Sequence, residues 1–242
     1  MRETTHTIKS AYLGNERRVW IREPENILTA SHLVVFLDGE LYRDWVEANG
    51  VINKLLSNRE IADAWFVFVS MESVESRWRE CPCYAPFAGF IVEELLPWLE
   101  RRHPEITAAQ QRTLAGLSYT GLAAAFVAKE FPGVFQKIIS QSGSFWSNNC
   151  SLIDEFAGME RHASTAFYLD VGSQETQENV RHREDVLQVV SQIEAVSRFR
   201  DVLLEKGYSV KYTEFEGGHE FPAWRRTLPE ALIWVLPMEI EK

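Results

Sequence analysis

The segment 115-AGLSYTGLAAAF-126 places Ser118 between an apolar run and a run of small apolar residues. The letters before it are typical of a short strand, and those after it have helical spacing. This is the setting of a nucleophile elbow, in which small neighbours let the chain turn sharply. Gly116 meets that need two positions before the serine, but Thr120 stands two positions after it and glycine is delayed to Gly121. The segment therefore predicts either a nucleophilic serine on a tight turn or a serine that caps the helix.

The rest of the sequence predicts a sheet around this turn. Continuous apolar runs are typical of strands buried on both faces of a parallel sheet, and polar-apolar alternation is typical of half-exposed strands. We expect strands at residues 8–12, 17–21, 32–37, 64–69, 113–116, 135–140, 166–171 and 210–215. Helical spacing is found at residues 45–56, 87–99, 121–131, 186–204 and 224–236. This order predicts an α/β fold, a doubly wound and mostly parallel sheet with antiparallel N-terminal strands and helices on both faces.

Length, composition and charge limit the functional classes. The 242 residues suit one domain, 1–242, and no repeat or linker divides them. A net charge of −10 opposes binding to nucleic acid or an anionic membrane. No apolar stretch suits a signal peptide or a membrane helix, so we expect a cytoplasmic protein. Three cysteines, including Cys81 and Cys83, lack the spacing of a zinc site and are expected to be reduced thiols. We expect neither a metal nor a cofactor.

A serine nucleophile needs a base, and the segment FEGGHEFPAW supplies a candidate in His219. It follows the last expected strand, where sites form in sheets of this type. Two glycines before it let the backbone bring the imidazole into such a site. The other five histidines are expected to be structural or solvated; they are His6, His32, His103, His162 and His182.

The acid that would orient the base is expected just beyond the strand at residues 166–171. Glu175 lies there and gives the chain order Ser, acid, His of the α/β-hydrolases. Asp170 is the competitor, although a residue within the strand is expected to point into the fold. We favour Glu175.

Backbone N–H groups are needed to bind the oxyanion of a tetrahedral intermediate. The residue after the nucleophile, Tyr119, supplies one in an elbow. Gly39 permits an unusual backbone path after the strand at residues 32–37, so the N–H of Glu40 is the second candidate. The alternative for this DG sequence is a simple turn.

Several blocks of the chain resemble the enterochelin esterase family of the esterase D-like α/β-hydrolases. They match in order across roughly residues 30 to 235: FLDGE, RWRECP with EELLPWL, AGLSYTGLAAAFVAKEFPGVFQKIISQSGSFW, LDVGSQE and GGHEFPAWRRTL. The resemblance implies Ser118 as nucleophile, His219 as base and Glu175 as acid, with some family members described as using a Ser-His dyad. It also implies hydrolysis of the ester bonds of iron-loaded triscatecholate siderophores.

The resemblance further suggests which residues contact the substrate. Arg77 corresponds to the arginine of the family's R-x-x-E-L block, and Arg79 lies beside it. The chain departs from that block at Cys81, which replaces leucine, and at Tyr84, where siderophore esterases tend to carry asparagine. Three aromatic residues could form a stacking wall for an aromatic acyl group or could fill the core: Trp78, Phe145 and Trp146.

The leading hypothesis is therefore a serine esterase that acts on a small-molecule ester through an acyl-enzyme on Ser118. The same residues suit an acyltransferase, which passes the acyl group to another alcohol, and a thioesterase. A siderophore- or sugar-binding protein without turnover is a further alternative, for which Thr120 in the elbow is the best support.

Overall fold

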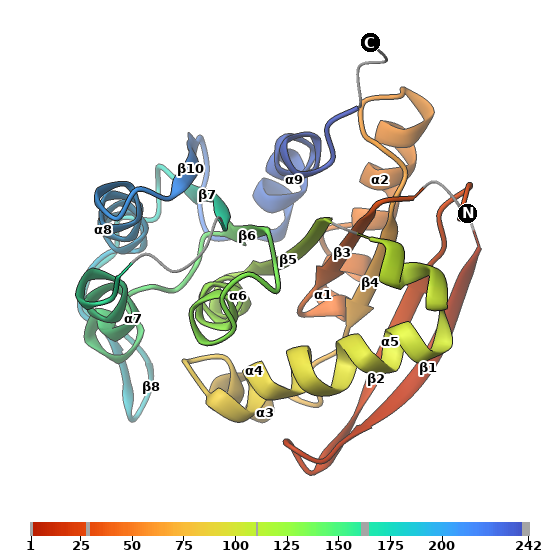
Figure 1. Cartoon of the computed structure of the whole chain (residues 1–242). Helices are drawn as coiled ribbons and strands as arrows, with labels where there is room; N and C mark the ends of the chain where they lie inside the picture. The colour runs from red at the N-terminus through yellow and green to blue at the C-terminus, as the bar shows by residue number, and fades with distance from the viewer. Residues whose placement is uncertain (1, 28–29, 110, 161–164, 239–242) are drawn as a thin grey trace.

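The sheet that the sequence predicts is present in the computed structural model, which describes residues 2–27, 30–109, 111–160 and 165–238. Eight strands lie in the order β1-β2-β4-β3-β5-β6-β7-β10 (Figure 1). Their bounds are β1 (Glu3–Ser10), β2 (Asn15–Arg22), β3 (His32–Phe36), β4 (Trp65–Val69), β5 (Gln111–Leu117), β6 (Lys137–Gln141), β7 (Ala166–Gly172) and β10 (Ser209–Phe215). The short strands β8 (Val180–Arg183) and β9 (Val186–Gln188) form a separate two-stranded sheet.

Strand direction confirms the expected fold class. β2 runs antiparallel to both β1 and β4, and the pairs from β4 through β3, β5, β6 and β7 to β10 are all parallel. The parallel strands β3 and β4 are buried along their whole length, as their continuous apolar runs predict. Their carboxyl ends therefore meet at one edge of the sheet, where the loops that follow them can assemble a site.

Helices cover both faces of the sheet. Figure 1 shows α2 and α9 on one side and α5 and α6 on the other. One face is covered by α1 (Gly39–Asp44), α2 (Ala48–Ser57) and α9 (Phe221–Val235). The opposite face is covered by α4 (Ala85–Gly89), the π-helical turn η1 (Phe90–Leu95), α5 (Leu96–Arg102), α6 (Tyr119–Glu130), α7 (Ser147–Gly158) and α8 (Gln192–Glu205). The remaining helices are α3 (Val74–Glu80) and the 3₁₀ helix η2 (Pro104–Ala108).

Two of the helices expected from periodicity begin later than predicted. The helix expected from Val186 begins at Gln192, because residues 186–188 form β9 of the hairpin and Ser191 caps the helix by accepting a hydrogen bond from the N–H of Glu194. The helix expected from residue 45 begins at Ala48, after Glu47 adopts a left-handed conformation with a φ of 55°.

A buried ion pair fixes α3 to the sheet. Arg17 on β2 donates a hydrogen bond to the carboxylate of Glu80 at the end of α3, and neither side chain is exposed. Arg79 binds the other oxygen of the same carboxylate, with 2.8 Å between Nη2 and Oε1. This anchor holds in place the helix that carries Arg77 and Trp78.

Candidate active site

Ser118 occupies a sharp turn between β5 and α6. Its φ of 54° and ψ of −121° are a strained conformation for a residue with a side chain, of the kind that functional sites retain. A Cβ added at Gly116 would lie 2.1 Å from the carbonyl oxygen of Thr120, so only glycine allows the helix to fold back against the strand. The side chain of Ser118 accepts no hydrogen bond as a helix cap.

Thr120 is accommodated in this turn through its hydroxyl. The Oγ1 atom accepts a hydrogen bond from the N–H of Leu117 at 3.0 Å and lies 3.0 Å from Oδ2 of Asp38. The close contact that excludes a side chain falls one residue later, because a Cβ at Gly121 would lie 2.6 Å from Oγ of Ser140. The G-x-S-x-G pattern is broken because the position that requires glycine is residue 121 and not residue 120. The sharp turn at Ser118 is nevertheless formed.

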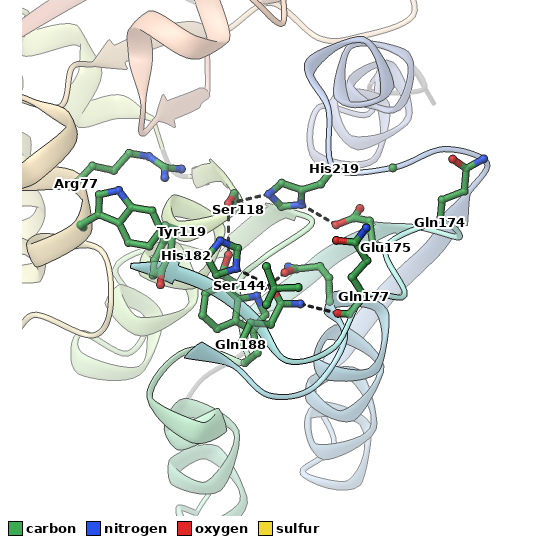
Figure 2. Close-up of a pocket in the computed structure, with 15 residues that line it drawn as sticks. Arg77, Ser118, Tyr119, Ser144, Gln174, Glu175, Gln177, His182, Gln188 and His219 are labelled. Atoms are coloured by element: carbon green, nitrogen blue, oxygen red, sulfur yellow. Dashed lines mark hydrogen bonds and ion pairs between the residues drawn. The ribbon is translucent and has the colours of Figure 1, made fainter. Parts of the chain in front are cut away.

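His219 lies within hydrogen-bonding distance of both Ser118 and Glu175 (Figure 2). Nε2 of His219 is 3.0 Å from Oγ of Ser118, and Nδ1 is 2.6 Å from Oε2 of Glu175. His219 comes from the loop between β10 and α9, whereas Glu175 follows β7. The three groups thus meet at the carboxyl edge of the sheet, in the order that a serine, a base and an orienting acid require.

The other oxygen of Glu175 is held by two donors. Oε1 accepts hydrogen bonds from the N–H of Gly172 at 2.8 Å and from the hydroxyl of Ser142 at 2.7 Å. The indole N–H of Trp224 donates in turn to that hydroxyl at 3.0 Å, and the Trp224 ring meets the His219 ring edge to face. Donors on one carboxylate oxygen leave the other free to face the imidazole and fix its orientation.

Asp170, the competing acid, lies beneath this group and is fully buried. Its Oδ1 accepts a hydrogen bond from the N–H of Ser142 at 3.1 Å, as expected for a residue inside β7 that bonds to the backbone. Burial raises the pKa of Asp170 to about 7, although donors from Thr227, Ser142 and Gln141 oppose the shift.

The loop that carries the second expected oxyanion donor is tied to the elbow through Asp38. Its carboxylate binds Nε of Arg77 at 2.8 and 3.0 Å and Oγ1 of Thr120. Glu40 is in the first turn of α1, and Tyr119 begins α6, so both are placed where N–H groups lack an intrahelical partner. The carboxylate of Glu40 accepts from the N–H of Met71, and burial raises its pKa.

A cavity of about 500 Å³ opens above Ser118. Two of the aromatic residues expected in a substrate wall, Trp78 and Trp146, line it, and so does Arg77. The complete lining is Arg77, Trp78, Ser118, Tyr119, Ser144, Trp146, Gln174, Glu175, Gln177, Val180, His182, Gln188, Gln192, Gly218 and His219.

Two of the expected substrate-binding residues do not line the cavity. Phe145 has no exposed surface and stacks on Phe199 of α8, with ring centroids 4.0 Å apart, because it points into the core while Trp146 points into the cavity. The side chain of Arg79 is 60% exposed and pairs with Glu80. Phe145 therefore fills the core, which is the alternative that its letter left open, and Arg79 lies outside the cavity lining.

The hairpin of β8 and β9 forms a wall that the sequence did not predict. His182, for which the sequence indicates a structural or solvated role, lines the cavity and stacks on Trp146 with ring planes 8° apart. Its Nε2 lies 2.9 Å from Oε1 of Gln188, and the amide of Gln188 donates to the carbonyl oxygen of Gln177. No spacing motif connects these residues to the elbow, so only the folded chain identifies them.

The block SQSGSFW, residues 140–146, supports the site from below. Gln192 donates to the carbonyl oxygens of Ser142 and Gly143 at 2.6 Å each and accepts from the indole N–H of Trp146. Oγ of Ser144 lies 3.3 Å from Oγ of Ser118. The family resemblance includes this block, but its role in holding the acid could not be inferred from its letters.

The part of the chain that the structure describes contains no cluster of three or more histidine, cysteine or acidic side chains arranged to hold a metal ion. Cys81, Cys83 and Cys150 are all free thiols, and burial raises the pKa of Cys83 to about 12. Across the same residues, each helix is too short or too polar to cross a bilayer.

Comparison with known proteins places this chain among esterases. Residues 10–235 match the family described as "Putative esterase". The Iron(III) enterobactin esterase of Dickeya dadantii is 28% identical over 94% of this chain and 53% of that protein, and that of Escherichia coli K12 is 28% identical over 93% and 55%. The chain thus spans about half the length of these curated relatives.

Solved structures with a similar fold include an esterase. The enterobactin esterase Fes from Shigella flexneri, determined in the presence of enterobactin, has a TM-score of 0.84 and 26% identity, covering 97% of this chain and 59% of its own. The BES protein from Bacillus cereus, at 20% identity, shares the fold with a TM-score of 0.74 over 98% of this chain and 95% of that one.

Proposed function

This chain belongs to the esterase family that it matches from residue 10 to residue 235, and from that premise we propose that it is a serine hydrolase of carboxylic esters. The observation that carries the proposal is the hydrogen-bonded series from Ser118 through His219 to Glu175. The series lies at the floor of a cavity large enough for a small-molecule ester.

In the proposed reaction, Oγ of Ser118 attacks the ester carbonyl carbon while Nε2 of His219 takes the hydroxyl proton. The negative charge that develops on the carbonyl oxygen is bound by the N–H groups of Tyr119 and Glu40. His219 then gives its proton to the leaving alcohol, which leaves an acyl group on Ser118. A water molecule, deprotonated by His219, releases the acid, and Glu175 stabilises the imidazolium in both steps.

A fluorophosphonate probe tests the nucleophile. The folded wild type should be labelled on Ser118, whereas Ser118→Ala should be neither labelled nor active, with a loss on the order of 10⁴-fold or more. Absence of labelling in the folded wild type would contradict the proposal. A 4-nitrophenyl acetate assay on the same samples measures turnover directly.

We propose a catecholate triester of the siderophore type as the first substrate class to test. The names of two relatives and the ligand in the Shigella structure support this choice, and Trp78 and Trp146 offer aromatic walls. A panel of a ferric catecholate triester, its iron-free ligand, short nitrophenyl esters and a glutathione thioester would rank the acyl groups. Product analysis with an added alcohol would reveal acyl transfer.

We also propose a cytoplasmic location for the protein, which the three free cysteines support because reduced thiols are typical of that compartment. Fractionation of the cells that produce it, with immunodetection, tests this.

A further inference from the structure

The charged side chains that line the cavity are paired with opposite charges. Of the described lining residues, Arg77 and Glu175 carry fixed charges, and His219 and His182 can be charged when protonated. The carboxylate of Glu175 is paired with the His219 imidazole. Among the lining residues that the structure describes, Arg77 is therefore the one side chain that could give a bound anion a permanent positive charge.

Asp38 neutralises that charge. Nε of Arg77 lies 2.8 and 3.0 Å from the two carboxylate oxygens, and Asp38 is almost completely buried, with 1% of its side chain exposed. Burial lowers the pKa of Arg77, but neighbouring groups, Asp38 foremost, raise it overall. An ion pair presents a dipole to a distant anion and attracts it much less than a free guanidinium does.

A second arginine, next to the cavity-lining residue Trp78, is also paired with a carboxylate. Arg183 on β8 covers the Trp78 ring, with its guanidinium carbon 5.3 Å from the ring centroid, and binds the carboxylate of Glu75 at the start of α3. The hairpin segment 178-ENVRHRED-185 contains three acidic residues and two arginines. The whole chain has a formal charge of −10, so no excess of positive charge compensates at long range.

Much of the remaining wall is aromatic or already hydrogen-bonded, and Gln174 and Gln177 add neutral amide groups. The Tyr119 ring makes T-shaped contacts with the rings of Trp78 and Trp146, and His182 stacks on Trp146. The amide groups of Gln188 and Gln192 are bound within the protein. Such walls favour flat, uncharged groups, because a charged group would lose water without gaining an opposite charge.

We propose that this site selects uncharged esters with a flat acyl group and discriminates against anionic ones. The inference rests on the proposed function, since it describes the substrate of the same site. The inference predicts that the site prefers an uncharged triester over a strongly anionic metal complex of the same ligand as its substrate.

Two matched substrates test the inference. The 4-nitrophenyl monoesters of terephthalic acid and of terephthalamic acid have the same shape, but the first carries a carboxylate and the second a neutral amide. We expect kcat/KM at low salt to be about 10-fold or more higher for the amide, given the range of electrostatic effects on association. Raising the NaCl concentration should increase kcat/KM for the anionic ester selectively, because salt screens repulsion. An equal or faster reaction of the anionic ester would overturn the inference.

Two variants with the same change in net charge locate the effect. Glu75→Gln frees Arg183 beside the cavity-lining Trp78, and Glu100→Gln frees Arg112, which lies near the start of β5 at the opposite edge of the sheet. Glu75→Gln should lower the ratio of kcat/KM for the neutral ester to kcat/KM for the anionic ester about two- to threefold at low salt, as expected for one charge near the substrate. Glu100→Gln should leave it unchanged. An equal effect of both variants would contradict a local origin in the cavity.

A binding measurement keeps this test separate from the test of turnover. Ser118→Ala can be titrated by calorimetry with the anilides of the same two acids, which it cannot cleave. A lower Kd for the neutral anilide supports the charge preference, whether or not the wild type hydrolyses either ester. If the wild type hydrolyses neither ester and is not labelled by the fluorophosphonate, only the esterase proposal is rejected. Equal binding of the two anilides, or tighter binding of the anionic one, rejects the charge preference.

Discussion

The hydroxyl of Ser142 donates a hydrogen bond of 2.7 Å to the carboxylate oxygen of Glu175 that faces away from His219. Ser142 adopts a left-handed φ of 46° directly after β6, which pairs with β7 as far as Gln141 and Asp170. The acid of the candidate site is thus positioned by a residue 33 positions earlier in the chain.

Ser142→Ala should lower kcat for a short nitrophenyl ester about 10-fold, because it removes one hydrogen bond to a buried charge and leaves the indole N–H of Trp224 unpaired. KM should change little. Ser140→Ala is the matched control, since the Ser140 hydroxyl is buried without a partner among the described residues. Equal losses in the two variants would show that the effect is structural.

Glu175→Gln should lower kcat by about 10²- to 10⁴-fold, since a neutral amide cannot stabilise the imidazolium. Asp170→Asn should stay within about 10-fold of the wild type, because Asp170 bonds to the backbone of Ser142 and not to the imidazole. Steady-state kinetics on both variants decide between the two acids, and the reverse ranking would reassign the role to Asp170.

Asp170 should also make stability depend on pH. Its pKa rises on folding from 3.8 to about 7, so the folded protein holds this proton more tightly than the unfolded chain. The cost of burying the ionised form is absent below about pH 4, grows as the pH rises and is complete above about pH 7, at about 1.4 kcal/mol for each pH unit between the two pKa values. Urea denaturation should therefore show Asp170→Asn gaining stability relative to the wild type as the pH rises from about 4 to about 8. A difference that stays constant with pH would refute this.

Gly116→Ala should abolish activity and destabilise the protein, because the new Cβ would lie 2.1 Å from the backbone oxygen of Thr120. The same substitution at Gly50 in α2 meets no atom within 4 Å and should raise the free energy of unfolding by about 0.5–1 kcal/mol. Thermal melts and ester hydrolysis test both. An active, stable Gly116→Ala protein would mean that the elbow tolerates a side chain.

The buried pair of Arg17 and Glu80 should be costly to break. Glu80→Gln leaves Arg17 without its compensating charge and should lower the free energy of unfolding by about 3 kcal/mol or more. The double variant Arg17→Met with Glu80→Leu should lose less than this single variant, because no buried charge remains. Urea titrations of the three proteins measure the comparison, and a double variant less stable than Glu80→Gln would contradict it.

The sheet is largely predictable because its signal is local. The buried runs at residues 32–37 and 64–69 correspond to β3 and β4 with a shift of one residue at one end. The hairpin of β8 and β9 is not predictable in the same way, because the apolar residues of β9, Val186 and Leu187, also fit the helical pattern that continues into α8. Periodicity does not separate a strand from a helix over three residues.

The candidate site is predictable only where one residue type has a specific chemistry. The positions of Ser118, His219 and Glu175 at the ends of strands follow from the order of elements, and the structure brings them together. Phe145 and Trp146 are adjacent and both aromatic, so their letters do not show which one faces the cavity. That distinction depends on Phe199, more than fifty residues further along the chain.

The hairpin of β8 and β9 pairs with no strand of the eight-stranded sheet within the described chain. Changes in the length or sequence of this hairpin therefore leave the pairing of the strands that position Ser118, His219 and Glu175 intact. The part of the cavity wall that this hairpin supplies, including His182 and Gln188, can thus change independently of Ser118, His219 and Glu175, so related proteins can acquire different ester preferences through changes in the hairpin.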